Sequence, residues 1–439
     1  MIRIDLPGTS QEDFDDAIAV LEECKAKTIP CFGFIYPFMG PGGQYGNCWW
    51  ERDTALTLSG YKWIDLDFAE NVLRNFMLVQ KPNGRIPLWG PDRVGDYDEE
   101  LSAVPVIFEV ALKVLKMSDD ADLLRETYGM LCGYLNWWLS DVKRDPATGL
   151  VCGIFEESDP SDFRDQLTAA PVDLNVQVCV GADVLREIAE HMGLKDDAAH
   201  WKQVFCSMRD IINEYLFDPE SGGYYTYLVK EKRLQTERIY NSMLDTFKRN
   251  IVPEERRAGL IRFLEAKEHF DLHGKYAIVT ASHSSPEYQE TVGVYKGWTS
   301  WSGNIWTFRN EIIATGLREA GENELAAELA YRTIIEFSGN YAEFLSPSTG
   351  IGHGVERYGW TASQYIQLII EEIFGIKDDH WNGNVIVAPN IPEVLTGREI
   401  SLSGLTVSAG GEKGELSVRA IRLADGSVKV EKEIRPLPL

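Results

Sequence analysis

Residues 340–362 read NYAEFLSPSTGIGHGVERYGWTA, and the predicted fold is organised around this stretch. Its Gly, Ser, Thr and Pro content predicts a loop, and the pattern turns helical only after Trp360. Glu343 lies near the start of the loop and Glu356 near its end. A long polar loop that keeps acids and aromatic residues in front of a helix favours a binding or catalytic role. An ordinary surface loop with anchoring aromatic residues is the alternative.

Helical patterns surround this loop on both sides, so the chain is predicted to be mainly α-helical. Ser10 is the predicted N-cap of the first helix, and Gly60 the predicted end of the second. About twelve helices are predicted, over residues 11–25, 52–59, 66–80, 99–117, 119–142, 173–192, 196–217, 239–248, 253–266, 303–320, 323–338 and 360–374. Short turns alternate with long loops, which is typical of an (α/α)6 toroid with its long loops on one face. A helical solenoid is the alternative, but the sequence shows no fixed repeat period.

The pattern changes after Phe374. Segments 384–392, 398–409, 414–423 and 426–434 alternate apolar and polar residues, with Gly-containing turns between them. They predict a small β appendage of about four strands. The expected domains are therefore a helical toroid over residues 1–376 and a β domain over residues 377–439.

Composition narrows the possible partners. The chain has 439 residues, 44% of them hydrophobic, and a formal net charge of -25, which argues against nucleic acid and anionic membranes as partners. No apolar run is long enough to span a bilayer and no signal peptide is recognisable, so a cytoplasmic protein is expected. The seven cysteines are scattered without CxxC pairs, which favours reduced thiols over a zinc site. Without nucleotide or metal motifs, we expect neither a cofactor nor a metal.

Aromatic residues indicate a carbohydrate substrate. The chain has 12 Trp and 18 Tyr, and many of the tryptophans lie in predicted loops beside Gly, Pro and carboxylates. Sugars combine apolar C–H faces with polar rims, so flat rings beside acids and amides suit them. The candidates on this ground are Trp50, Trp89, Trp301, Trp306 and Trp360. The alternative for each ring is a place in the core.

Three loops carry acids suited to hydrolysis. They are residues 50–53, which read WERD, residues 156–162, which read EESDPSD, and the loop that holds Glu343. Glycoside hydrolysis needs one carboxylic acid to protonate the leaving oxygen and one carboxylate to activate water or attack carbon. With 68 acidic residues, however, such pairs also arise by chance, so a solvated surface role is the alternative for each acid.

Four segments resemble the inverting (α/α)6 glycosidases, namely the trehalases of family 37 and above all family 63. PVDLN at 171–175 matches a family segment that begins an inner helix, and SGNIW at 302–306 is similar to the family's RGPxW. EFLSPSTG at 343–350 with YGWT at 358–361 resembles EQYNPxTG followed by FGWS or FGWT. Trp50 to Asp53 occupies the place of an early W-D segment. The four occur in the family's order.

The resemblance implies roles for single residues. Glu343 would be the general base, and the general acid would be Asp159, preferred, or Asp162. The expected substrate-binding residues are Trp50, Arg52, Asp53, Trp89, Asn175, Trp301, Trp306, Glu356 and Trp360. The substrate would be a short α-glucoside or α-mannoside, cleaved with inversion. The chain departs from the family in the ESGxD and RGPxW patterns, and an α-rhamnosidase, a debranching-type enzyme or a non-catalytic sugar-binding protein are the alternatives.

Overall fold

The computed structural model describes residues 1–26, 33–45, 48–90, 101–153, 168–291, 302–409 and 412–437. Within these residues the main helices are α1 (Gln11–Cys24), α2 (Glu51–Tyr61), α3 (Leu66–Val79), α4 (Ile107–Met117), α5 (Ala121–Trp138), α6 (Val172–His191), α7 (Lys195–Tyr215), the 3-10 segment η3 (Asn241–Asn250), α8 (Glu254–Glu265), α9 (Thr307–Glu319), α10 (Asn323–Phe337), α11 (Gly359–Gln367) and the π-helical η5 (Leu368–Ile373). Ser10 caps α1 as predicted, accepting a hydrogen bond from the Asp13 amide.

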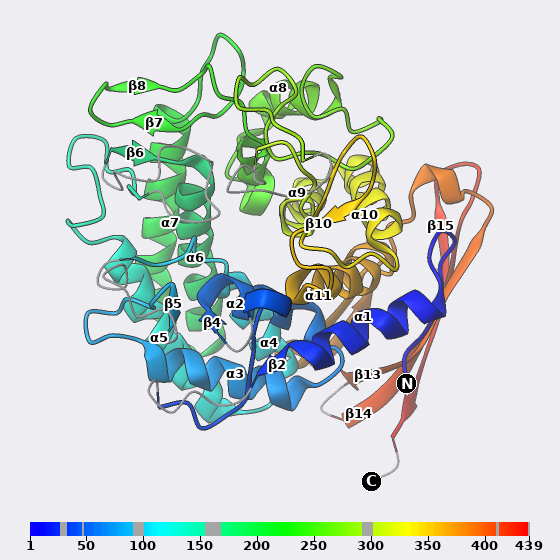
Figure 1. Cartoon of the computed structure of the whole chain (residues 1–439). Coiled ribbons are helices and arrows are strands. Elements are labelled where there is room, and N and C mark those ends of the chain that lie inside the picture. Colours follow the sequence, from blue (N-terminus) through cyan, green and yellow to red (C-terminus); the bar gives the residue numbers. More distant parts are fainter. Residues whose placement is uncertain are drawn as a thin grey trace.

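Six helices contact one another in a closed series around a common axis (Figure 1). The order is α2, α4, α6, η3, α9, α11 and back to α2. One further helix separates each member of the series from the next along the chain, and these helices pack against the series from outside, such as α1 on α11, α7 on α6 and α10 on α9. Because the inner helices all occupy the same place in this alternation, their N-termini lie at one end of the molecule and their C-termini at the other.

The described strands form one larger sheet and several two- or three-stranded ones. The larger sheet has the order β1 (Arg3–Asp5), β13 (Glu399–Ala409), β14 (Glu412–Arg422), β15 (Val428–Pro436) and is antiparallel throughout. The short strands are β2 (Lys25–Ala26) with β3 (Phe38–Met39), β4 (Trp49–Trp50) with β5 (Trp89–Gly90), β6 (Ala169–Ala170) with β7 (Tyr227–Leu228) and β8 (Arg233–Leu234), β9 (Phe344–Leu345) with β10 (Gly352–His353), and β11 (Ile376–Asp379) with β12 (Asn384–Val387).

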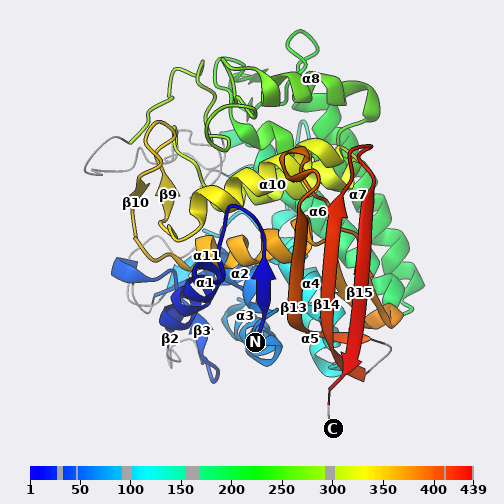
Figure 2. The same cartoon turned by 90° about the vertical axis from the view of Figure 1, so that its right-hand side faces the viewer.

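The larger sheet lies along one side of the helices and unites the two ends of the chain (Figure 2). Its covered face carries apolar side chains such as Leu402, Leu405, Leu416 and Val418, which belong to the same continuous core as the helices. Since β1 comes from the N-terminus, this sheet is built from both termini. No helix among the described residues is both long enough and apolar enough to cross a membrane.

Three sequence-based expectations need correction. The helix expected over residues 99–117 begins only at Ile107 in the described part, because Pro105 disfavours helical backbone at the residue before it. Gly60 lies within α2 and does not end it. The helix expected over residues 239–248 is a 3-10 segment that is non-helical at Lys248 and Arg249.

Candidate functional site

The loop after α10 folds back as a short hairpin. Strands β9 and β10 pair across a turn in which the Gly350 amide donates to the Ser346 carbonyl at 2.8 Å, with Gly350 in the left-handed region at φ +71°. Leu345 and Ile305 exchange backbone hydrogen bonds of 2.9 and 3.0 Å, which attach the hairpin to the segment before α9. Glu343 therefore stands at the open end of the hairpin, next to the N-termini of two inner helices.

The Glu343 carboxylate is held by donors from two segments. Its Oε2 accepts the backbone N–H of Val355 at 3.1 Å, and its Oε1 accepts the hydroxyl of Tyr45 at 3.3 Å. Glu343 is 8% exposed, whereas Glu356 from the same loop is exposed. Hydrogen bonds that a carboxylate accepts favour its ionised form. Of the two acids in this loop, Glu343 is therefore the one placed to act as a base.

A second carboxylate lies at the start of α2. Asp53 occupies the first turn of this helix, and its Oδ1 accepts the Tyr358 hydroxyl at 2.6 Å. The partial positive charge of a helix N-terminus favours a carboxylate at this position. Trp50, just before the helix, pairs with Trp89 across β4 and β5, with ring centroids 5.1 Å apart. The N-termini of α2 and α11 are thus joined through Asp53 and Tyr358.

Tyr45 connects these two groups. Its ring meets Trp50 and Tyr358 edge-on, with centroid distances of 5.9 and 6.1 Å, while its hydroxyl reaches Glu343. The structure thereby brings Glu343, Asp53 and Trp50 together at one end of the inner helices. These residues come from opposite halves of the sequence. A carboxylate, a second acid and flat rings in one place suit a sugar.

Most of the predicted ligand-contacting residues in the described part of the chain are buried, including Asp53 at 2% and Trp50 at 7% exposure. Trp306 and Trp360 are 1% and 0% exposed, and Trp306 stacks on Phe344 with centroids 4.9 Å apart. The guanidinium of Arg52 lies 4.5 Å above the ring centre of Phe308 and is buried as well. In this structure these side chains support the hairpin from the core side.

A buried group of charges lies among the inner helices. Arg309 binds Asp245 through two hydrogen bonds of 2.8 and 2.9 Å, which link α9 to η3. Burial raises the pKa of Asp245 to about 6, against the opposite influence of Arg309. Asp173 raises this pKa further and Arg52 lowers it. Asp173 and Arg52 come from the first turns of α6 and α2, so the charges sit near the N-terminal ends of the inner helices.

The side chain of Asn175 forms hydrogen bonds with the backbone of two neighbouring segments. Its Oδ1 accepts the Val151 amide at 2.8 Å, and its Nδ2 donates to the carbonyls of Val151 and Pro171 at 2.9 and 2.8 Å. These bonds attach the start of α6 to the chain just before the acidic segment. The candidate acids Asp159 and Asp162 lie outside the described residues, as does Trp301.

Sequence reasoning did not single out Tyr45 or Gly354. Tyr45 contacts the site through tertiary structure, and the only local signal is the pair Gly42 and Gly43 in front of it, both with positive φ. Gly354 lies in the loop that was singled out, but its role depends on how closely Glu343 approaches it. Neither property is encoded in residue spacing.

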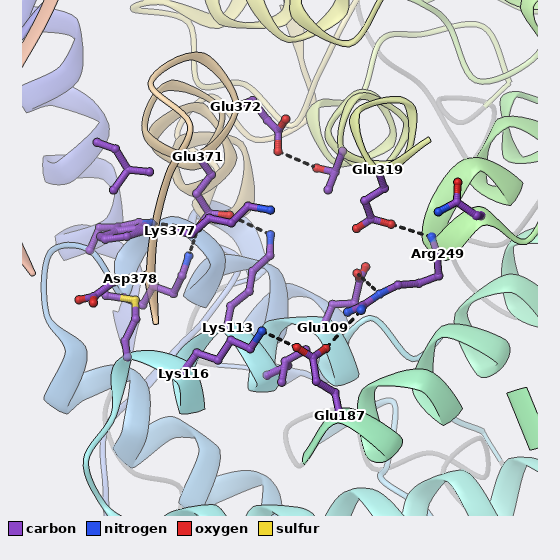
Figure 3. A pocket seen from close by; sticks show the side chains of 17 residues that line it. Glu109, Lys113, Lys116, Glu187, Arg249, Glu319, Glu371, Glu372, Lys377 and Asp378 are labelled. Atoms are coloured by element: carbon purple, nitrogen blue, oxygen red, sulfur yellow. Dashed lines mark hydrogen bonds and ion pairs between the residues drawn. The ribbon is translucent and has the colours of Figure 1, made fainter. Parts of the chain in front are cut away.

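A cavity of about 350 Å³ lies at the other end of the inner helices (Figure 3). It is lined by oppositely charged side chains that pair with one another, as Lys113 does with Glu371 at 2.9 Å and Arg249 with Glu187 at 3.3 Å. Burial would raise the pKa of Glu371, but Lys113 and Lys62 outweigh burial and lower it to about 2. Because these charged side chains already pair with one another, we place the candidate site at the opposite end of the inner helices, where Glu343 lies.

Part of the sequence is similar to known glycoside hydrolases. Residues 154–361 match the family described as mannosylglycerate hydrolase MGH1-like glycoside hydrolase domain. A mannosylglycerate hydrolase of Thermus thermophilus is 27% identical over 152 residues, which are 34% of this chain and 34% of that protein. The resemblance to the family 63 glycosidases is confirmed.

Solved structures show the fold. The crystal structure of a family 63 mannosylglycerate hydrolase from Thermus thermophilus, in complex with glucose, superposes with a TM-score of 0.65 at 17% identity, over 81% of this chain and 99% of that one. A family 78 rhamnosidase of a Bacillus species superposes with a TM-score of 0.68 at 13% identity, over 99% of this chain and 41% of that one. The match to the curated relatives spans between 32% and 43% of their length.

Proposed function

We propose that this chain hydrolyses the α-glycosidic bond of a short substrate and inverts the anomeric centre. Glu343 is the general base, and Asp159 or Asp162 is the general acid. The observation that carries the proposal is the Glu343 carboxylate, which lies within the matched residues 154–361 and accepts hydrogen bonds from Val355 and Tyr45.

The chemistry follows from these roles. Glu343 takes a proton from a water molecule as the water oxygen attacks the anomeric carbon. The aspartic acid gives its proton to the glycosidic oxygen as the bond to the leaving group breaks. A water molecule must fit between the two carboxyl groups, so we expect them to lie roughly 6.5–9.5 Å apart. Asp53 accepts hydrogen bonds from sugar hydroxyls, and Trp50 with Trp89 covers the apolar face of the ring.

The substrate proposal rests on the relatives. Several are mannosylglycerate hydrolases, so α-mannosylglycerate and α-glucosylglycerate are the first substrates to test. We also infer that the closed series of inner helices is the (α/α)6 toroid of these neighbours, formed by residues 1–376. In this interpretation residues 377–439 are a β domain, which Arg3–Asp5 joins as an edge strand.

An α-L-rhamnosidase is the second candidate. The rhamnosidase neighbour superposes on 99% of this chain, whereas the mannosylglycerate hydrolase superposes on 81%. The wider match extends the shared fold nearly to both ends of this chain. This favours an α-L-rhamnoside as the third substrate class to test.

The experiment measures hydrolysis of α-mannosylglycerate, α-glucosylglycerate, trehalose and aryl α-glycosides, including the α-L-rhamnoside. Wild type is compared with Glu343→Gln and with the control Glu433→Gln, an exposed acid of β15. Loss of the base lowers kcat by roughly 10²–10⁴-fold, and the control keeps its rate. NMR of the first-formed anomer reports inversion.

The outcomes separate the roles. Asp159→Asn and Asp162→Asn are measured in parallel, and the general acid is the one whose loss abolishes turnover of substrates with poor leaving groups. If Glu343→Gln keeps its rate, the base lies elsewhere. If the wild type hydrolyses nothing in the panel but binds a member of it, the chain is a sugar-binding protein on an enzyme fold.

A further inference from the structure

Glu343 depends on two chain segments that are far apart in sequence. The donor to Oε2, Val355, lies 12 residues away, and the donor to Oε1, Tyr45, lies 298 residues away. A glutamate side chain has three rotatable bonds, so its carboxylate reaches a defined place only when other groups hold it. The two donors hold one oxygen each.

Gly354 makes the first of these contacts possible. A Cβ at this position would lie 2.3 Å from Oε2 of Glu343 and 2.7 Å from its Cβ. Because the Cβ of Glu343 is fixed to the backbone, rotation of the carboxylate alone does not remove the second clash. Gly354 also has φ +76°, a left-handed conformation that favours glycine. The absence of a side chain therefore lets the Val355 amide approach the carboxylate.

Two further glycines bring the second donor into place. A Cβ at Gly43 would lie 2.6 Å from Cγ1 of Val355, and one at Gly42 would lie 2.7 Å from the carbonyl of Arg357. Just before them, the Pro41 carbonyl accepts the Gly359 amide at 2.9 Å. Residues 41–45 thus lie directly on the segment that follows Glu343.

We propose that Tyr45 and Gly354 are positioning residues for Glu343, an inference that rests on the proposed role of Glu343 as general base. Tyr45 fixes one carboxylate oxygen by donation, and Gly354 gives the Val355 amide access to the other. Together they fix where the carboxylate lies relative to the water to be activated. Neither residue exchanges a proton with the substrate.

The first test is the pH profile of kcat/KM on whichever panel glycoside the wild type hydrolyses. The acidic limb of this profile reports the pKa of the free enzyme's base. Tyr45→Phe removes a donor to the ionised form, so the limb moves up by about half a pH unit. Tyr358→Phe is the matched control, because its hydroxyl donates to Asp53; it lowers activity but leaves the limb in place. An unmoved limb in Tyr45→Phe, or an equal shift in both variants, overturns the inference.

The second test substitutes two glycines of the same hairpin. Gly354→Ala introduces the clash with Glu343. Gly350 has a comparable φ of +71°, and the three atoms nearest to a Cβ there belong to the Tyr276 side chain, at 3.0 to 3.3 Å. A displacement of about 1 Å lowers kcat roughly 10²-fold, with KM changed less than about threefold. The control Gly350→Ala has the same kind of backbone strain but does not displace the Glu343 carboxylate. Equal losses of kcat in the two variants overturn the role of Gly354.

Crystal structures test the positioning roles of Tyr45 and Gly354 independently of the proposed function. If the wild type hydrolyses no panel glycoside, the proposed function fails, and structures of wild type and Gly354→Ala decide the positioning role. A displaced Glu343 carboxylate in Gly354→Ala supports it, and a carboxylate still within hydrogen-bond distance of Tyr45 and Val355 overturns it. Should Gly354→Ala not fold, the structure and pH profile of Tyr45→Phe decide alone.

Discussion

At Gly60, the helix that carries Asp53 lies close against α11, the helix that Tyr358 precedes. A methyl group on the Cα of Gly60 would lie 2.0 Å from the Ser363 carbonyl oxygen in α11, against about 3.4 Å for an ordinary contact. In Gly60→Ala the helices must separate by more than 1 Å. Overpacking of this kind costs about 1–3 kcal/mol. Separation also weakens the hydrogen bond from the Gly60 amide to Ser363 Oγ, 2.8 Å long, at about 1 kcal/mol.

The higher helix propensity of alanine offsets about 1 kcal/mol of this loss. The expected net destabilisation is therefore about 1–3 kcal/mol, measured from guanidinium denaturation midpoints followed by circular dichroism. Gly129→Ala in α5 is the matched control, because a Cβ there meets nothing within 4 Å and only the propensity gain of about 1 kcal/mol remains. If the two variants are equally stable, the close approach of α2 and α11 does not limit stability and the reasoning is wrong.

Three further predictions concern buried polar groups. Glu371→Gln deprives the buried Lys62 of its charged partner, so the free energy of unfolding should fall by about 3–5 kcal/mol. The control Glu433→Gln, at an exposed position, should change the free energy of unfolding by less than about 0.5 kcal/mol. Burial raises the pKa of Glu336 to about 8, above its value in the unfolded chain. The folded protein therefore binds this proton more tightly than the unfolded chain does, and protonation of Glu336 stabilises the fold. Stability should accordingly fall by roughly 2 kcal/mol as pH rises from about 5 to 8, allowing for partial exposure, and denaturation of Glu336→Gln should show a flatter pH dependence. Asn175→Ala leaves buried backbone groups without their hydrogen-bond partner, so the free energy of unfolding should fall by roughly 3 kcal/mol and kcat should fall as well. If neither quantity changes, Asn175 has no role in holding the acidic segment.

Much of the local structure was predictable because it depends on neighbouring residues. Apolar residues at helical spacing predicted α1, α3, α6 and α10 to within one or two residues of their observed ends. Ser10 was recognisable as a cap, because capping needs only a side-chain oxygen next to the first turn. The β alternation also marked β13 to β15, although β11 and its pairing with β12 were missed.

The errors arose where tertiary contacts overrule local preference. Gly60 has the composition signal of a helix end, yet the helix continues because only glycine lets α11 approach it. Trp306 and Trp360 have the sequence surroundings of pocket residues, and the closure of the inner helices buries them, so their contact with a substrate stays a prediction. Burial depends on which faces meet, and a single sequence does not show this.

The sequence by itself determined the helical class and the polar loop at 340–362, because periodicity and turn composition are local properties. It singled out Glu343 through the resemblance to family 63, and the role of this residue stays a prediction. Only the tertiary structure decided that Tyr45 reaches Glu343 across 298 residues and that Tyr358 reaches Asp53 across 305. It also decided that β1 joins β13. These contacts exist because the inner helices meet in a closed series, which places their N-termini side by side whatever their distance along the chain.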